Sequence, residues 1–140
     1  MARTSTTAKP PTPTTVVLVR HGQTPTTGAT LPGRAPGLHL SETGRRQADR
    51  AASRISALAP VAAVYTSPLE RTRETAAPIG RALGVRPRTE RGLLECDFGD
   101  WTGRKLAELR RTATWRTVQR YPSGFRFPAG ESFAEMRHRI

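Results

Sequence analysis

Near its start the sequence reads Val16-Val17-Leu18-Val19-Arg20-His21-Gly22-Gln23-Thr24, an apolar run that passes directly into polar residues and a glycine. A short continuous run of mostly β-branched residues is typical of a strand that is covered on both faces in a parallel sheet. In α/β proteins, ligands bind beyond the carboxyl ends of such strands. We therefore predict a strand over residues 16–19 and a ligand site in the residues that follow it.

The segments after this run alternate between helix and strand patterns. Ser41 is positioned to cap a helix, and the apolar face of that helix is predicted from residues at helical spacing: Ala48, Ala51, Ile55 and Leu58. Residues 61–65 form a second strand candidate. A second helix follows, with Gly84 as its stop, and its predicted face is Leu69, Thr72, Ala76, Ile79 and Leu83. Residues 85–88 are a third strand candidate. This order predicts an α/β fold with a mostly parallel sheet and helices on both faces.

The two ends of the chain differ from the middle. Residues 1–15 contain six threonines and three prolines without an aliphatic run, so we expect a disordered tail. Residues 16–140 are expected to form one domain with a single modest core. Near the last residue, Phe133, Met136 and Ile140 recur at helical spacing without a stop signal, and three strands are few for such a sheet. We expect the domain to be incomplete at its C-terminus.

The formal net charge is +12, and 21 of the 23 cationic residues are arginines because Lys9 and Lys105 are the only lysines. The arginines are spread along the chain, which is a weak signature of nucleic-acid binding. We therefore expect no nucleic-acid partner. The densest arginine stretch, residues 115–127, also contains aromatic residues, and we interpret it as a lid or a small additional packing cluster.

Several classes of function are excluded by composition. No apolar run has the roughly eighteen residues that a membrane span needs, and no secretory signal is recognised, so we expect a cytoplasmic protein without a membrane partner. The single Cys96 excludes an internal disulfide framework. The three histidines lack metal-ligand spacing, and we expect no metal or other cofactor.

Cationic groups follow two of the predicted strands at the same edge of the sheet. Arg20 and His21 follow the first, and Arg71 and Arg73 lie near the start of the second helix. Planar guanidinium groups bind the oxygens of a phosphoryl group, and a neutral imidazole can attack phosphorus in line. This combination predicts phosphoryl chemistry with His21 as the nucleophile.

The sequence resembles the histidine phosphatase superfamily, the phosphoglycerate mutase-like proteins, in four segments that occur in order. They are residues 17–24, residues 40–48 (Leu40-Ser41-Glu42-Thr43-Gly44-Arg45-Arg46-Gln47-Ala48), residues 65–72 (Tyr65-Thr66-Ser67-Pro68-Leu69-Glu70-Arg71-Thr72) and residues 94–103 (Leu94-Glu95-Cys96-Asp97-Phe98-Gly99-Asp100-Trp101-Thr102-Gly103). The resemblance also includes Gly130-Glu131-Ser132, and it extends over residues 16–140.

The resemblance implies roles for individual residues. His21 would be the nucleophile and the site of a phosphohistidine, and Glu95 would be the proton donor, with Asp97 as its nearby rival. The phosphate and the substrate would be held by the residues around His21 and by one residue of the second helix: Arg20, Gly22, Gln23, Thr24 and Arg71. The partner would then be a small phosphorylated metabolite; the oligomeric state is not implied.

One residue of the family pattern has no counterpart. Members carry a second catalytic histidine in a His-Gly pair after an apolar strand, whereas His138 lies inside a helix pattern and precedes Arg139. We expect a phosphatase or phosphomutase that acts on small phosphate monoesters through a phosphohistidine at His21. The alternative is a truncated, catalytically inactive remnant or a phosphate-binding module.

Overall fold

The computed structural model describes residues 13–58 and 60–140. The predicted disorder of the N-terminal tail therefore lies mostly outside the described residues. The elements follow one another in the order α1 (Glu42–Ser56), β1 (Tyr65–Thr66), α2 (Glu70–Leu83), β2 (Arg88–Thr89), η1 (Arg91–Leu93), η2 (Gly99–Trp101), α3 (Leu106–Leu109), α4 (Ala113–Arg120), η3 (Pro122–Gly124) and α5 (Phe133–Arg139), where η marks a short 3₁₀ helix.

Both predicted central helices form, and local signals set their ends. The Ser41 hydroxyl accepts a hydrogen bond from the Gly44 N–H at 3.1 Å, which caps α1 as predicted. Helix α2 ends at Gly84, whose left-handed conformation (φ 64°) lets its N–H reach the last carbonyls of the helix. The predicted face of α1 needs one correction, because Ala52 is buried in place of Ala51, and Leu58 lies beyond the helix end and is exposed.

The two strands form a short parallel sheet with α2 as the connection between them. Tyr65 pairs with Arg88 and Thr66 pairs with Thr89. The pairing is extended by the Arg88 N–H, which donates to the Val64 carbonyl at 2.9 Å, and by the Glu90 N–H, which donates to the Thr66 carbonyl at 2.8 Å. The predicted α/β class with a parallel sheet is confirmed, and the strands lie a few residues further along the chain than expected.

The predicted strand over residues 16–19 is wrong for this structure. The segment has no regular secondary structure, and its four side chains are 43–92% exposed. Within the described ranges it makes no strand pairing or isolated bridge. An apolar run becomes a strand only when another segment supplies its hydrogen-bond partners, and no described segment does so here.

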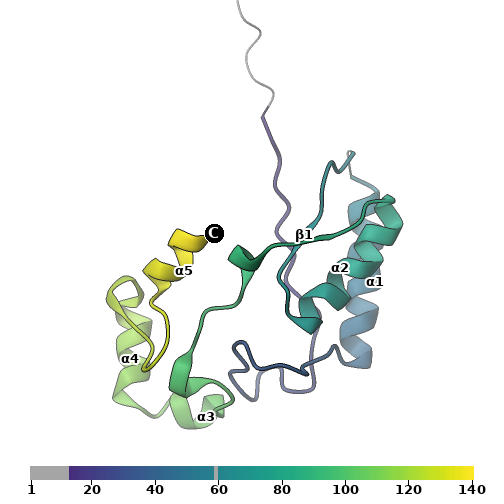
Figure 1. The fold of residues 1–140 in the computed structure, drawn as a ribbon. Coiled ribbons are helices and arrows are strands. Elements are labelled where there is room, and N and C mark those ends of the chain that lie inside the picture. The colour runs from purple at the N-terminus through teal and green to yellow at the C-terminus, as the bar shows by residue number, and fades with distance from the viewer. Residues whose placement is uncertain (1–12, 59) are drawn as a thin grey trace, which may run out of the picture.

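The expectation of a single core is also wrong, because the buried apolar residues form two clusters. The first lies between α1 and α2 and contains Ala52, Ile55 and Ile79, with Val61, Val64 and Leu83 packed against it. The second is mostly aromatic and is formed by Cys96, Trp101, Leu109, Val118, Phe125 and Phe127. Figure 1 shows the corresponding two lobes, with α1 and α2 in one and α3, α4 and α5 in the other. The stretch 115–127 therefore belongs to a packing cluster.

Two glycines allow the backbone after His21 to lie directly against α1. A Cβ atom added to Gly44 would lie 2.0 Å from the Gln23 carbonyl oxygen, and one added to Gly22 would lie 2.3 Å from the Gly44 carbonyl oxygen. Both obstacles are backbone atoms, which have little freedom to move aside. The position of the His21 segment on α1 therefore depends on the absence of side chains at these two residues.

We expect Gly44→Ala to destabilise the protein even though alanine is the better helix former. The new methyl group must displace the backbone at Gln23, and such overpacking costs about 1–3 kcal/mol of unfolding free energy. Chemical denaturation measures the loss. Ser53→Ala, at an exposed position of the same helix, is the control and should change stability by less than about 0.5 kcal/mol. Equal stability of Gly44→Ala and the wild type would contradict the close approach.

Candidate functional site

His21 is half-buried and has one fixed ring nitrogen. Its Nδ1 lies 2.8 Å from the Gly22 carbonyl oxygen. Because a carbonyl oxygen can only accept, Nδ1 must carry the proton in this contact. The neutral ring then has its lone pair on Nε2, which is the form that a nucleophilic imidazole requires.

Thr75 connects the His21 segment to helix α2. The Gly22 N–H donates to the Thr75 hydroxyl oxygen at 3.1 Å, and that hydroxyl donates to the Arg71 carbonyl at 2.8 Å. Thr75 and Gly22 are both buried, so water does not replace these contacts. The hydroxyl therefore holds the residue after His21 against the helical turn that carries Arg71.

Arg71 is a buried cation, and part of its guanidinium group has no hydrogen-bond partner among the described residues. Its side chain is among the most buried in the described chain, at 1% exposure, and Nη2 donates to the Gly33 carbonyl at 2.9 Å. Neither Nε nor Nη1 has a hydrogen-bond partner among the described residues. Burial lowers the pKa of Arg71, while the nearby carboxylates of Glu95 and Glu70 act against this shift. Unpaired buried N–H groups on a guanidinium are suited to an anion with several oxygens.

Glu95 lies between η1 and η2 and is close enough to influence the charge of Arg71. Its Oε1 accepts a hydrogen bond from the Cys96 N–H at 3.0 Å. The rival carboxylate is used differently, because Asp97 Oδ1 accepts from the Gly99 N–H at 3.0 Å and Oδ2 lies 3.7 Å from Arg34 Nη1. The structure thus brings Glu95 to the buried guanidinium and engages Asp97 in a local turn.

The other predicted site residues lie around His21 with different exposure. Thr24 is buried, and its N–H donates to the Thr27 hydroxyl at 2.8 Å. Gln23 is exposed, with its N–H on Gln47 Oε1 at 2.9 Å. Arg20 is exposed, and within residues 13–58 and 60–140 no hydrogen bond or ion pair joins it to Arg71. The structure therefore links the backbone of Gly22, next to His21, to that of Arg71 through Thr75, and it leaves Arg20 at the surface.

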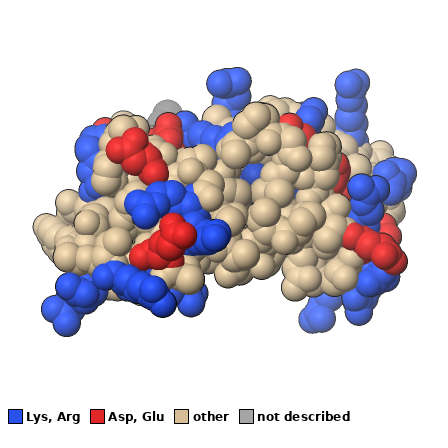
Figure 2. Space-filling model, turned by 90° about the horizontal axis from the view of Figure 1, so that it is seen from below, with Lys and Arg blue, Asp and Glu red and all other residues tan. Residues whose placement is uncertain are grey.

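The surface charge is distributed rather than concentrated. On the face drawn in Figure 2, Lys and Arg side chains lie in separate groups over the molecule, several of them beside acidic side chains. None of the helices that the structure describes has the length and apolar character to cross a membrane. No group of three or more His, Cys, Asp and Glu side chains suited to a metal ion occurs in the described part of the chain.

Comparison with known proteins identifies the family. The sequence profile of the histidine phosphatase superfamily (branch 1) matches residues 16–140. The chain belongs to this superfamily. The resemblance in the four sequence segments is thereby confirmed, and the phosphoglycerate mutase-like fold is confirmed by the solved structures that it matches.

Relatives of this superfamily member include both curated proteins and solved structures. The bifunctional protein Rv2228c of Mycobacterium tuberculosis is 36% identical over 132 residues, which cover 92% of this chain and 36% of that protein. Phosphoserine phosphatase 1 of Hydrogenobacter thermophilus is 31% identical, with 89% of this chain and 60% of that protein covered. Mycobacterial glucosyl-3-phosphoglycerate phosphatase in complex with inorganic phosphate matches with a TM-score of 0.74 at 31% identity, covering 85% of this chain and 55% of that one. The chain thus spans between about a third and three fifths of these proteins.

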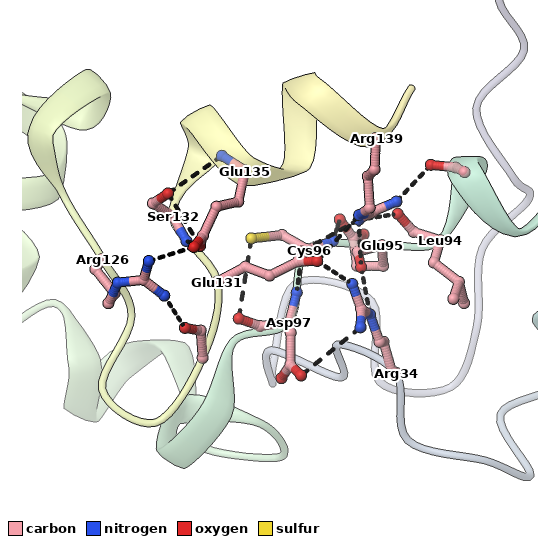
Figure 3. A network of polar contacts seen from close by, with 12 residues as sticks. Arg34, Leu94, Glu95, Cys96, Asp97, Arg126, Glu131, Ser132, Glu135 and Arg139 are labelled. Carbon is pink, nitrogen blue, oxygen red and sulfur yellow. Dashed lines mark hydrogen bonds and ion pairs between the residues drawn. The ribbon is translucent and has the colours of Figure 1, made fainter.

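The protein also contains a charged network that the sequence analysis did not predict (Figure 3). Glu131 lies between two arginines, with its Oε1 2.8 Å from Arg34 Nη2 and 3.0 Å from Arg139 Nε. Its Oε2 accepts from the Asp97 N–H at 3.0 Å. Burial by itself would raise the pKa of Glu131, but the hydrogen bonds from Arg139, the Asp97 N–H and Arg34 outweigh it and lower the pKa to about 2.

Different signals were available for the missed residues. Thr75 lies four positions after Arg71, so a shared helical face was readable from the spacing. Glu131 belongs to a segment that carries the family resemblance, but the resemblance gave it no role. Arg34 and Arg139 are two of 21 arginines, and no local pattern distinguishes them.

We expect Thr75→Val to lower stability and to release the Gly22 amide. Valine keeps the shape but leaves a buried N–H without an acceptor, which costs about 1–3 kcal/mol. Thr75→Ser keeps the hydroxyl and should lose only about 1 kcal/mol for the missing methyl group. Unfolding free energies and hydrogen exchange at Gly22 measure both effects. Slow exchange at Gly22 in Thr75→Val would contradict this assignment.

The lowered pKa of Glu131 predicts an acid-dependent loss of stability. The group titrates at its ordinary value of 4.5 when unfolded and at about 2 when folded, so its contribution is complete above pH 4.5 and is lost as the pH falls toward 2. Glu131→Gln should therefore be less stable than the wild type at pH 7, by an amount on the order of 2–3 kcal/mol. The difference should shrink as the pH approaches 2.

Denaturation curves from pH 7 down to pH 2.5 measure this difference. Glu42→Gln is the control, because the Glu42 side chain is 88% exposed and its ion pair with Arg46 lies at the surface. A difference between Glu131→Gln and the wild type that stays constant over the whole pH range would contradict the network.

Proposed function

We propose that this histidine phosphatase hydrolyses small phosphate monoesters through a phosphohistidine at His21. One observation carries the proposal: the buried Arg71 guanidinium has two nitrogens, Nε and Nη1, without partners among the described residues, and the backbone of Arg71 is linked through Thr75 to Gly22, the residue after His21. A phosphoryl group supplies the negative oxygens that such donors require. The phosphatase relatives, one of them in complex with phosphate, support the same class of ligand.

In the first step, the lone pair on His21 Nε2 attacks phosphorus, and the bond from phosphorus to the ester oxygen breaks. Arg71 binds the phosphoryl oxygens and stabilises the charge that they carry in the transition state. Arg20, Gly22, Gln23 and Thr24 contribute to the same pocket. The Glu95 carboxyl group gives its proton to the departing oxygen, so that the product leaves as a neutral alcohol.

In the second step, water attacks the phosphohistidine. The bond between nitrogen and phosphorus breaks, its electron pair returns to Nε2, and the Glu95 carboxylate takes the proton from the water. The products are inorganic phosphate and the starting form of His21. Transfer to another hydroxyl of the same substrate, in place of water, would make the protein a phosphomutase.

We expect His21→Ala to abolish phosphate release from phosphate monoesters and Glu95→Gln to slow it by a factor of about 10²–10⁴. Arg71→Lys should weaken the binding of inorganic phosphate, because lysine lacks the planar fork of donors. Arg73→Lys is the matched control, since Arg73 is exposed on the same helix. Phosphate release, phosphate binding by calorimetry and acid-labile labelling of His21 are the measurements.

The possible results separate the enzyme from a phosphate-binding module. Release and labelling that require His21 support the proposed hydrolysis, and isomerised phosphoester among the products indicates a mutase. Phosphate binding that requires Arg71, without any release of phosphate from an ester, indicates the phosphate-binding module. The chain spans only part of the length of its relatives, so both outcomes are tested. Release that survives His21→Ala would contradict the proposed mechanism.

A further inference from the structure

Three residues from distant parts of the sequence hold the backbone around Glu95. Arg34 comes from the loop before α1, Glu131 from the residues before α5, and Arg139 from the end of α5. We call Arg34, Glu131 and Arg139 the clamp. Figure 3 shows all three side chains directed toward the segment 94–97.

The clamp contacts that segment mainly through its carbonyl groups. Arg139 Nη2 donates to the Leu94 carbonyl at 2.6 Å and to the Glu95 carbonyl at 3.1 Å, and Nη1 donates to the Gly92 carbonyl. Arg34 Nε donates to the Glu95 carbonyl at 2.7 Å. The Glu95 carbonyl therefore accepts from both arginines of the clamp.

The amide groups of the segment are held as well. The Asp97 N–H donates to Glu131 Oε2 at 3.0 Å, and the Glu131 N–H donates back to the Asp97 carbonyl at 2.8 Å. Residues 94–98 have no regular secondary structure, so no helix or strand pairing fixes them. The clamp supplies the hydrogen bonds that regular structure would otherwise provide.

The donors of the clamp are occupied by the protein itself, in contrast to those of Arg71. Arg34 makes three contacts through its three nitrogens, to the Glu95 carbonyl, Asp97 and Glu131. Arg139 likewise engages all three nitrogens. Each nitrogen of the two guanidinium groups thus faces an acceptor of the protein, with Arg34 Nη1 in an ion pair at 3.7 Å, whereas Arg71 keeps two nitrogens unpaired among the described residues. Their geometry therefore fits a positioning role better than a substrate-binding one.

We propose that Arg34, Glu131 and Arg139 are positioning residues that hold the main chain of Glu95 so that its carboxyl group meets the ester oxygen of a phosphate bound at Arg71. This inference rests on the proposed function. A carboxyl group donates a proton efficiently only when it is held within hydrogen-bond reach of the acceptor. A variant protein without the clamp would bind phosphate normally at Arg71, and its Glu95 would transfer the proton poorly.

The test compares two substrates that differ in their need for a proton. An alkyl ester such as glycerol 3-phosphate expels a basic alkoxide and needs the acid, whereas 4-nitrophenyl phosphate expels a stable anion without it. We expect Arg139→Lys and Arg34→Lys to lower kcat/KM for the alkyl ester about 10- to 100-fold, as a small misplacement of a catalytic group does, and to change kcat/KM for the nitrophenyl ester less than about threefold. The ratio kcat/KM is compared because it reports the steps up to departure of the alcohol, whereas hydrolysis of the phosphohistidine is common to both esters. The affinity for inorganic phosphate should change little.

Two controls make the result specific. Arg126→Lys changes the guanidinium that pairs with Glu135 of α5 and donates to the Gly130 carbonyl; among the described residues it has no hydrogen bond or ion pair to residues 94–97, and its replacement should leave both substrates unaffected. In a Glu95→Gln background, adding Arg139→Lys should cause no further loss on the alkyl ester, because the clamp acts only through Glu95.

Equal losses of kcat/KM on both esters, no loss on either, or a full additional loss in the Glu95→Gln background would each overturn the positioning role. Failure of the proposed function would give a different result: the wild-type protein would show no turnover that depends on His21. In that case hydrogen exchange over residues 94–98 still tests whether the clamp holds this segment. Faster exchange in Arg34→Lys than in Arg126→Lys supports the holding of the segment, and identical exchange overturns it. If the Arg139→Lys protein fails to fold, the Arg34→Lys protein still provides the test.

Discussion

The carboxylate of Glu131 joins segments that lie far apart in the sequence. One of its arginine partners comes from the loop that precedes α1, and the other ends α5 (Figures 1 and 3). A half-buried ion pair is stabilising only when its hydrogen bonds are complete, because the loss of hydration is large. Here both carboxylate oxygens have partners. The two hydrophobic clusters are separate, and polar contacts of the loop before α1 connect the lobes. Arg34 of this loop pairs with Glu131, the Leu31 N–H donates to the Arg104 carbonyl at 2.9 Å, and the Gly33 carbonyl accepts from Arg71.

The arginines of this protein fall into groups according to what occupies their donors. Arg34 and Arg139 contact carboxylates and backbone carbonyls through each of their nitrogens, whereas Arg71 is more deeply buried and has two nitrogens without a partner among the described residues. Many of the others are exposed, as the separate basic groups in Figure 2 illustrate. The net charge of +12 is thus a poor guide to function. The position of a single unsaturated guanidinium is far more informative than the number of cations.

The sequence predicted what depends on local signals. Helices α1 and α2 were predicted because the Ser41 cap and the Gly84 stop lie within a few residues of the helix ends. The strand over residues 16–19 was wrong because an apolar run indicates burial, while a strand also needs a partner elsewhere in the chain. Two clusters formed in place of one core because the phenylalanines and tryptophans all follow residue 97 and pack among themselves. The clamp was missed because its three members are brought together only by the fold.

The His21 segment gains its position from the residues that follow it. The apolar run before His21 is exposed and makes no strand pairing in the described structure, so it contributes little to holding the imidazole. Immediately after His21, Gly22 and Gln23 contact the Gly44 backbone, and the Gly22 N–H is bound to Thr75. Helices α1 and α2 therefore anchor His21 from one side, and the same turn of α2 carries Arg71. A candidate nucleophile and a candidate phosphate ligand that share one anchoring helix keep their spacing even when the preceding strand is not formed, which explains how the site stays assembled in a chain with so small a sheet.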